Sequence, residues 1–347
     1  MKTLIAKTRV PREYFIFLGV ALLLPVFVGF NGHLVHIFIM AFIWAIVACN
    51  WNLMMGYAGI FSFGQIAFFT IGAYATGILT RSPEAAVAAG ASTTVFFLGM
   101  PPWLGILAGG IVAAAVGFLI GLPCLRLKGI YVALVTFALH EALIAFIIAG
   151  RPIGTGGATN LTGIPPFSIG GLVFPTVART QWYYLILGIG FLMFYITHRV
   201  IHSSIGSAFV ALRDAEDYAK SLGVDDYKYK LIVFTLSALL TGIAGGFYAH
   251  YMQILSLRLL GLDIFLLVMI MVIIGGLGRF PGEVVAAFVF TYLNELLRPL
   301  DVFRAIILGA IVIVTIILAP GGFAGIFKSV ASHIKRGFAE RTLDSKQ

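Results

Sequence analysis

The sequence predicts an all-α polytopic membrane protein, on the evidence of its composition, its apolar segments and the placement of its charges. Of its 347 residues, 60% are hydrophobic and 11% are charged, whereas about a quarter of the residues in a soluble chain are charged. This composition overrides the two soluble domains that the length alone would suggest.

Apolar segments long enough to cross a bilayer recur along the whole chain. A bilayer core about 30 Å thick requires roughly 20 apolar residues per helix. We therefore predict about ten transmembrane helices, near residues 14–29, 34–55, 57–79, 103–122, 129–149, 182–198, 230–253, 262–278, 282–297 and 303–319. The apolar, Pro-flanked segment 84–99 is predicted as part of an external loop with room for a short helix. No convincing cleavage site follows the first span, so we expect a retained helix there and not a signal peptide.

Lysine and arginine are distributed unevenly between the two sides of these predicted helices. If the N-terminus is cytoplasmic, 17 of the 23 basic residues fall on the cytoplasmic side, most of them near the termini and in the loop 199–230. Basic residues favour the cytoplasmic side, so we expect both termini in the cytoplasm. The net charge of +9 then reflects topology and attraction to lipid headgroups, not nucleic-acid binding.

The segment 50–79 combines apolar residues with carboxamides, a hydroxyl and frequent glycines. Asn52, Ser62 and Gln65 either line a translocation path or form hydrogen bonds to neighbouring helices. Glycine permits bent or broken helix at membrane depth where the backbone is buried or lines a cavity. Our hypothesis is that this segment lines, or bends around, a substrate path at a subunit interface.

One carboxylate lies well inside a predicted span. Glu141 is about twelve residues into the span 129–149, next to His140. A charged side chain at this depth is costly and by default indicates a functional site. Glu141 could bind a cationic group of a substrate, or it could pair with an arginine or the backbone of a partner subunit, and we prefer this structural or interface role.

The loop 199–230 holds most of the charged residues found between the predicted spans. Residues 208–222 have helical spacing, and Gly223 follows in the usual position for a C-terminal cap. One side of this predicted helix carries its apolar residues, which are Phe209, Leu212, Ala215, Ala219 and Leu222. The helix either lies on the membrane surface as a connector or docks into a groove of a soluble partner.

Motifs for catalysis or metal binding are missing from the sequence. The segment 322–329 ("GFAGIFKS") has Phe327 where a phosphate-binding loop requires glycine, and no strand precedes it. Cys49 and Cys124 are far apart and have no metal-site spacing. We therefore expect no enzymatic activity, no metal and no cofactor in this chain.

Five ordered blocks between residues 50 and 327 resemble one family. The stretch "NLMMGYAGIFSFGQIAFFTIGAY" (52–74) is similar to the signature of the branched-chain amino acid permease family, in its LivM-like branch. The other similar blocks are "LRLKGIYVALVTFALHEAL", "TGGATNLTGIP", "MVIIGGLGRFPGEVVAA" and "LAPGGFAGIF". Asn160 and Phe323 stand where the family usually has glycine and leucine. The loop also resembles the coupling loop of ABC importer permeases, through Gly206, Ala208, Ala211, Arg213, Asp214, Glu216, Ala219, Leu222, Gly223 and Val224.

This resemblance implies a vitamin-B12-importer-like permease fold with two related halves. It implies a transmembrane domain over 1–327 that includes the coupling loop 199–230, and a cytoplasmic basic tail at 328–347. The partners it implies in a bacterial inner membrane are a homologous second permease, two ATPase subunits that use ATP and Mg, and a periplasmic binding protein. The residues implied in coupling to the ATPase are Gly206, Ala211, Arg213, Asp214, Glu216, Ala219, Leu222 and Gly223.

The implied activity is ATP-driven import, with branched-chain amino acids as the first candidate substrates. A urea or short-chain amide permease shares the same blocks, and import of aromatic or other amino acids is a further option. An ion-coupled secondary transporter or channel is the alternative from a different class, with Glu141 and His140 as its proton or ion site. The predicted docking helix favours the importer, whereas the carboxylate inside the membrane favours the secondary transporter.

Overall fold

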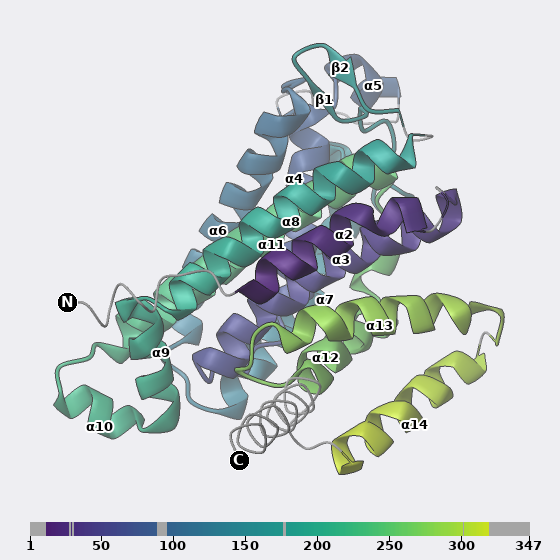
Figure 1. The fold of residues 1–347 in the computed structure, drawn as a ribbon. Helices are drawn as coiled ribbons and strands as arrows, with labels where there is room; N and C mark the ends of the chain where they lie inside the picture. Colours follow the sequence, from purple (N-terminus) through teal and green to yellow (C-terminus); the bar gives the residue numbers. More distant parts are fainter. Residues whose placement is uncertain are drawn as a thin grey trace, which may run out of the picture.

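The computed structural model describes residues 12–318, apart from residues 28, 30, 89–95, 176–177 and 301. The predicted basic tail and the first eleven residues lie outside the described residues. Within them, the chain is almost entirely helical, with one two-stranded hairpin formed by β1 (Ser168–Ile169) and β2 (Leu172–Val173) (Figure 1). The prediction of an all-α protein is confirmed.

A helix occurs at each of the ten predicted spans. These helices are α2 (Arg12–Phe27), α3 (Gly32–Asn52), α4 (Gln65–Thr80), α6 (Pro102–Cys124), α7 (Ile130–Ala149), α8 (Arg179–Ile201), α11 (Asp226–Met252), α12 (Leu262–Gly275), α13 (Gly282–Leu296) and α14 (Val302–Leu318). Among the described residues, five stretches are long and apolar enough to cross a membrane, namely Gly32–Tyr57, Pro102–Cys124, Ile130–Ala149, Arg179–Ile201 and Asp226–Met252. The short helices between them are α5 (Pro83–Ala88), α9 (Ser204–Asp214) and α10 (Glu216–Ser221).

Helix α11 lies at the centre of the bundle and packs against α4, α6 and α3. Small residues permit this close approach, as they do between membrane helices in general. A Cβ atom on Gly245 would lie 2.0 Å from the carbonyl oxygen of Phe69, and one on Gly242 would lie 2.5 Å from the Cβ of Ala113. We call α4, α6 and α11 the glycine-packed core.

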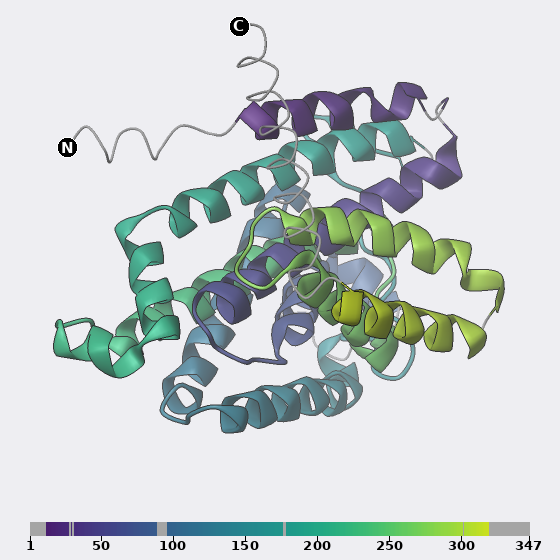
Figure 2. The same cartoon turned by 60° about the horizontal axis from the view of Figure 1, so that its bottom comes forward.

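A second group of helices packs beside this core. Helix α3 contacts α8 and α13, and α13 contacts α12. Helix α2 runs along α8 (Figure 1 and Figure 2), where the Tyr183 hydroxyl donates to the carbonyl oxygen of Ala21 at 2.6 Å. Helices α9 and α10 project from one end of the bundle, and the hairpin β1–β2 lies at the other (Figure 1).

The prediction for the span 57–79 is wrong in its first residues. The helix α3 continues instead as a π-helix, η1 (Leu53–Tyr57), and α4 begins only at Gln65. Gly59 takes a positive φ of 68°, a conformation that favours glycine. The chain therefore leaves the helical path between residues 58 and 64.

The single helix predicted over 208–222 is also wrong. Ala215 has an extended backbone, with φ −154° and ψ 76°, and separates α9 from α10. Gly223 takes a left-handed φ of 86° after α10, as its predicted capping role requires. Leu222 was predicted on the apolar side, but its side chain is 68% exposed because the break turns α10 away from the bundle.

The three 3₁₀ turns of the described chain lie next to the long helices. They are η2 (Arg151–Ile153), η3 (Leu257–Leu260) and η4 (Arg298–Leu300). Between η2 and η3, an antiparallel bridge joins Leu161 to Leu255, so the segment after α7 is fastened to the segment after α11.

Candidate functional site

The candidate site is the region where α9 and α10 meet the ends of the long helices. The hydroxyl oxygen of Ser203 caps α9 by accepting from the Gly206 amide at 3.3 Å. A Cβ atom on Gly206 would lie 2.2 Å from the carbonyl oxygen of Ile201, so only glycine permits the sharp turn from α8 into α9. Phe209 and Leu212 are buried and hold α9 against the bundle.

Arg213 links the last turn of α9 to the π-helix. Its Nη1 donates to the carbonyl oxygen of Gly56 at 2.5 Å, and its Nε donates to Asp214 Oδ1 at 2.8 Å. A hydrogen bond from a charged donor is stronger than a neutral one. The planar guanidinium can serve both acceptors at once, which the ammonium of lysine cannot do in the same geometry.

A charge network holds α10 against the start of α11. Glu216 pairs with Lys220 at 2.8 Å and with Lys230 at 3.0 Å, and Lys220 also pairs with Asp226 at 2.8 Å. The hydrogen bond from Lys220 lowers the pKa of the Glu216 carboxyl below its usual value. Hydrogen bonds to Asp226 and Glu216 raise the pKa of the Lys220 ammonium. The network thus favours the charged form of both groups.

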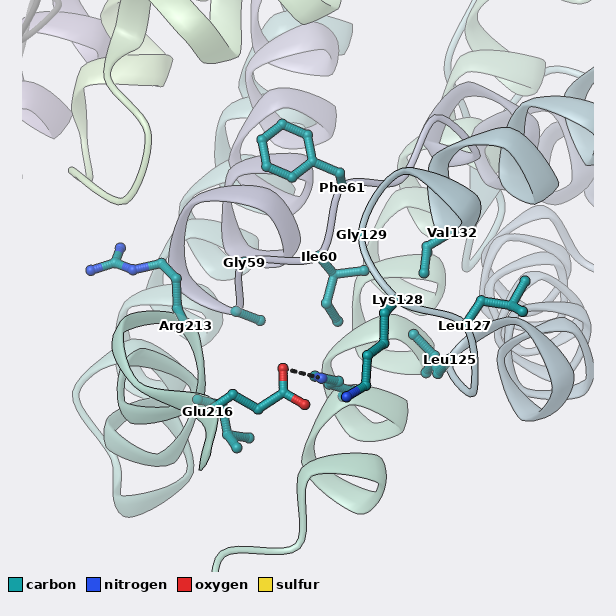
Figure 3. A pocket seen from close by; sticks show the side chains of 13 residues that line it. Gly59, Ile60, Phe61, Leu125, Leu127, Lys128, Gly129, Val132, Arg213 and Glu216 are labelled. Atoms are coloured by element: carbon teal, nitrogen blue, oxygen red, sulfur yellow. Dashed lines mark ion pairs between the residues drawn. The ribbon is translucent and has the colours of Figure 1, made fainter. Parts of the chain in front are cut away.

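A cavity of about 200 Å³ lies beside the contact of α9 and α10 with the ends of the long helices. It lies between the segment 58–61, the turn 125–132 and the residues Arg213 and Glu216. Figure 3 shows the Glu216 carboxylate and the side chain of Lys128 reaching into it from opposite sides.

The eight residues predicted for coupling divide into two groups. Gly206 and Ala219 are buried and shape the loop, and Glu216 is half-buried in the charge network. The exposed members of the set are Ala211, Arg213, Asp214, Leu222 and Gly223. The exposed group, together with Tyr218 of α10, forms a surface free to meet another molecule.

Three of the four predicted path residues are fully buried inside the chain. The Nε2 atom of Gln65 donates to Ser237 Oγ at 3.1 Å and also to Thr241. The Ser62 hydroxyl oxygen accepts from the Gly64 amide at 3.3 Å. Asn52 Oδ1 accepts from a backbone amide in the segment 276–281. Each side chain therefore has a partner within the chain, as the packing alternative expects.

Glu141 lies apart from these three residues, with its side chain exposed on the outer surface of α7. Its neighbour His140 is buried, and its Nε2 donates to the carbonyl oxygen of Leu260 at 2.9 Å. The two side chains therefore point to different surroundings and do not form a common site in this conformation.

Two residues that the sequence analysis did not select, Tyr57 and Glu283, lie beside the π-helix and the turn 276–281. The Tyr57 hydroxyl oxygen accepts from the Phe280 amide at 2.9 Å. Glu283 is 1% exposed, although it carries a carboxylate. The signal for Glu283 was available, because a charged residue follows the glycine-rich block and opens an apolar helix. Tyr57 carries no such signal in the sequence.

Comparison with known proteins gives a consistent result. A family model described as "Branched-chain amino acid transport system / permease component" matches residues 33–318. The chain is 28% identical over 309 residues to the high-affinity branched-chain amino acid transport system permease protein LivM of Escherichia coli (strain K12), and the match covers 83% of this chain and 69% of that protein.

Two further relatives extend the comparison. The LivM protein of Salmonella typhimurium has the same identity and coverage. A probable branched-chain amino acid transport permease protein LivM of Methanocaldococcus jannaschii is 26% identical over 273 residues, which is 73% of this chain and 77% of that protein. No solved structure is significantly similar to the chain.

Proposed function

Because the chain belongs to the family of branched-chain amino acid transport permease components, we propose that it is the transmembrane permease subunit of an ATP-driven ABC importer for branched-chain amino acids. The match over residues 33–318 is the observation that carries this proposal. The relatives named as LivM support the same substrate class. The chain is a multi-pass protein of the inner membrane.

We propose about ten membrane spans in a vitamin-B12-importer-like fold with two related halves. Helices at all ten predicted positions support this number, and five of the described helical stretches are by themselves long and apolar enough to cross a membrane. The transmembrane domain covers 1–327 with the coupling loop 199–230, and 328–347 is a basic tail. Both termini face the cytoplasm, as the distribution of lysine and arginine indicates.

The chain works with partners that supply ATP chemistry and substrate capture. We propose a homologous second permease, two ATPase subunits that use ATP and Mg, and a periplasmic binding protein. The surface of α9 and α10 meets the ATPase, because it projects from the bundle and exposes Ala211, Asp214, Leu222 and Gly223. Exposed apolar side chains on α6 and α7 are covered by lipid or by the second permease.

In this mechanism the permease converts ATP-driven closure of the ATPase dimer into movement of helices. Closure pushes on α9 and α10, and the helices around 50–79 and 230–278 then open the substrate cavity alternately to each side. Asn52, Ser62, Gln65 and Glu141 are the proposed residues of the path. Leucine in place of Ser62 or Gln65 should reduce uptake without preventing assembly, whereas normal uptake would assign both side chains to packing.

Uptake of labelled leucine tests the proposed function. Cells with and without this chain are compared, with ATP depletion and urea competition as controls. We expect ATP-dependent leucine uptake to disappear when the chain is deleted and to be insensitive to urea. Unchanged leucine uptake would remove this substrate class, and competition by urea would favour the short-chain amide alternative.

Co-purification tests the remaining alternative, an ion-coupled secondary transporter. A stable complex of this chain with an ATPase and a second permease is expected of an importer subunit. A chain that moves its substrate alone, driven by an ion gradient, would contradict the proposal. The separate surroundings of His140 and Glu141 give that alternative no shared ion site.

A further inference from the structure

The π-helix η1 (Leu53–Tyr57) is the least regular segment within the buried part of the bundle. The Ala58 amide donates to the carbonyl oxygen of Leu53, five residues earlier, at 3.3 Å. Such π-turns are rare and often occur at functional sites. This one lies where α9 meets the turn 276–281, which connects α12 to α13.

The Arg213 side chain, the Gly56 carbonyl group and the Gly278 backbone meet at one point of this junction. Arg213 of α9 donates to the carbonyl oxygen of Gly56 in η1. A Cβ atom on Gly278 would lie 2.6 Å from Arg213 Nη1 and 2.7 Å from the same carbonyl oxygen. The contact leaves no room for a methyl group, so Arg213, Gly56 and Gly278 are closely packed against one another.

The turn 276–281 is also fastened directly to the π-helix. Asn52 Oδ1 accepts from the Gly278 amide, and the Tyr57 hydroxyl oxygen accepts from the Phe280 amide, both at 2.9 Å. Backbone amides buried in a protein require such acceptors. The turn therefore depends on these two side chains, which stand at opposite ends of η1.

A buried pair at the same junction is incompletely bonded in this conformation. Glu283, the second residue of α13, lies next to Asn52 and Cys49. Both carboxylate oxygens of Glu283, and Nδ2 of Asn52, are buried without a hydrogen bond of good geometry within the described part of the chain, although the side chains of Asn52 and Cys49 lie within interaction range of the carboxyl group. Buried polar groups without partners cost free energy. A small shift of α13 relative to η1 could pair them and so stabilise a second arrangement.

We propose that Arg213, Asn52 and Tyr57 are the positioning residues of a coupling joint, through which movement of α9 is transmitted across η1 to α12 and α13. The inference rests on the proposed function, because it requires an ATPase that moves α9. It adds the path by which movement passes through this chain. It also assigns Arg213 a contact with the bundle and not with the ATPase. In each of these hydrogen bonds a side chain pairs with a backbone group. A substitution of the side chain therefore removes one bond and leaves the backbone group in place.

Tyr57→Phe tests the joint by removing one hydroxyl group. The complete importer is reconstituted in lipid vesicles, and leucine uptake and ATP hydrolysis are measured on the same preparation. We expect leucine uptake to fall about tenfold, the size of a typical coupling free energy between sites, while ATP hydrolysis stays close to wild type. The control Tyr184→Phe, at an exposed tyrosine of α8 away from the junction and from the surface of α9 and α10, should change neither rate.

The ratio of ATP hydrolysed to leucine imported distinguishes the outcomes. A purely structural role of Tyr57 would lower both rates together, and an unchanged ratio would overturn the joint. A wild-type complex that neither hydrolyses ATP nor imports leucine would overturn the proposed function, and the joint with it. If the wild-type complex imports leucine and Tyr57→Phe has the same ratio of ATP hydrolysed to leucine imported, the proposed function stands and the joint is overturned.

A distance measurement covers the case in which Tyr57→Phe fails to fold. Spin labels are placed at Ser207→Cys in α9 and Leu277→Cys in the turn, because both positions are exposed and the native Cys49 and Cys124 are buried. The joint predicts that the two labels keep their separation when ATP is added, since the segments move together. A separation that changes on ATP addition would overturn it.

Discussion

The glycine-packed core and the junction around the π-helix hold neighbouring segments together by different contacts. In the core, helices touch through glycine, and polar side chains such as Gln65 and Thr76 find partners on a neighbouring helix. At the junction, side chains hold backbone amides of a turn, as Asn52 does for Gly278 and Tyr57 does for Phe280. Dense packing resists deformation, so we expect the core to move as one body and the junction to pass movement between its segments through hydrogen bonds.

The largest effect is expected from a substitution that breaks the core. In Gly245→Ala, the new Cβ would lie 2.0 Å from the carbonyl oxygen of Phe69. We expect overpacking to cost about 1–3 kcal/mol or more and the yield of folded protein to collapse, as measured by size-exclusion chromatography in detergent. The control Gly188→Ala on α8 has no heavy atom within 4 Å of its Cβ and should behave as wild type. Equal yields would contradict the tight packing of α11 on α4.

A smaller effect is expected from Gly278→Ala at the junction. Gly278 has a φ of 68°, and its Cβ would meet Arg213. We expect the folded protein to persist but leucine uptake to fall about tenfold. The control Gly170→Ala carries similar backbone strain, with a φ of 56° but no neighbour within 4 Å. If Gly170→Ala lowers leucine uptake as much as Gly278→Ala does, backbone strain explains the loss and the contact with Arg213 does not.

The smallest effect is expected from the charge network, because exposed ion pairs contribute about 0–1 kcal/mol. The pKa of Glu216 is lowered in the folded protein, so its contribution is present above the unfolded pKa, close to 4.5, and is lost as pH falls through the folded pKa. The melting temperature of Glu216→Gln should therefore lie below that of wild type at pH 6–8 and converge with it in acid. Asp217→Asn, at an exposed neighbour, should show no such pH dependence.

Most helices could be predicted from the sequence, because their signals are local. Apolar length indicated a helix at each of the ten positions, and Gly223 indicated the end of the cytoplasmic helix. The π-helix and the break at Ala215 could not be predicted in this way. They accompany contacts between residues distant in the sequence, such as Arg213 with Gly56 and Glu216 with Lys230, which no local pattern specifies.

The candidate site was predicted in part for the same reason. Arg213 was identified from the resemblance of the loop, but its contact with the π-helix depends on how α9 folds back onto the bundle. Tyr57 lies in the family-like block 52–74, yet its role follows from a hydrogen bond to Phe280. Glu283 could not be distinguished from Glu141 by sequence, because both lie in apolar helices; the fold buries Glu283 and leaves Glu141 exposed on α7.

In the proposed importer, the surface of α9 and α10 binds the ATPase. Leu222→Asp tests it most directly, because Leu222 is 68% exposed and supports no core. The matched control is Leu172→Asp, at a leucine that is 71% exposed on the hairpin at the opposite end of the bundle. ATP hydrolysis that co-purifies with each tagged permease complex is measured. We predict a loss of about tenfold, or roughly 1.4 kcal/mol, for Leu222→Asp and no loss for Leu172→Asp; equal ATPase retention in both variants would contradict the claim.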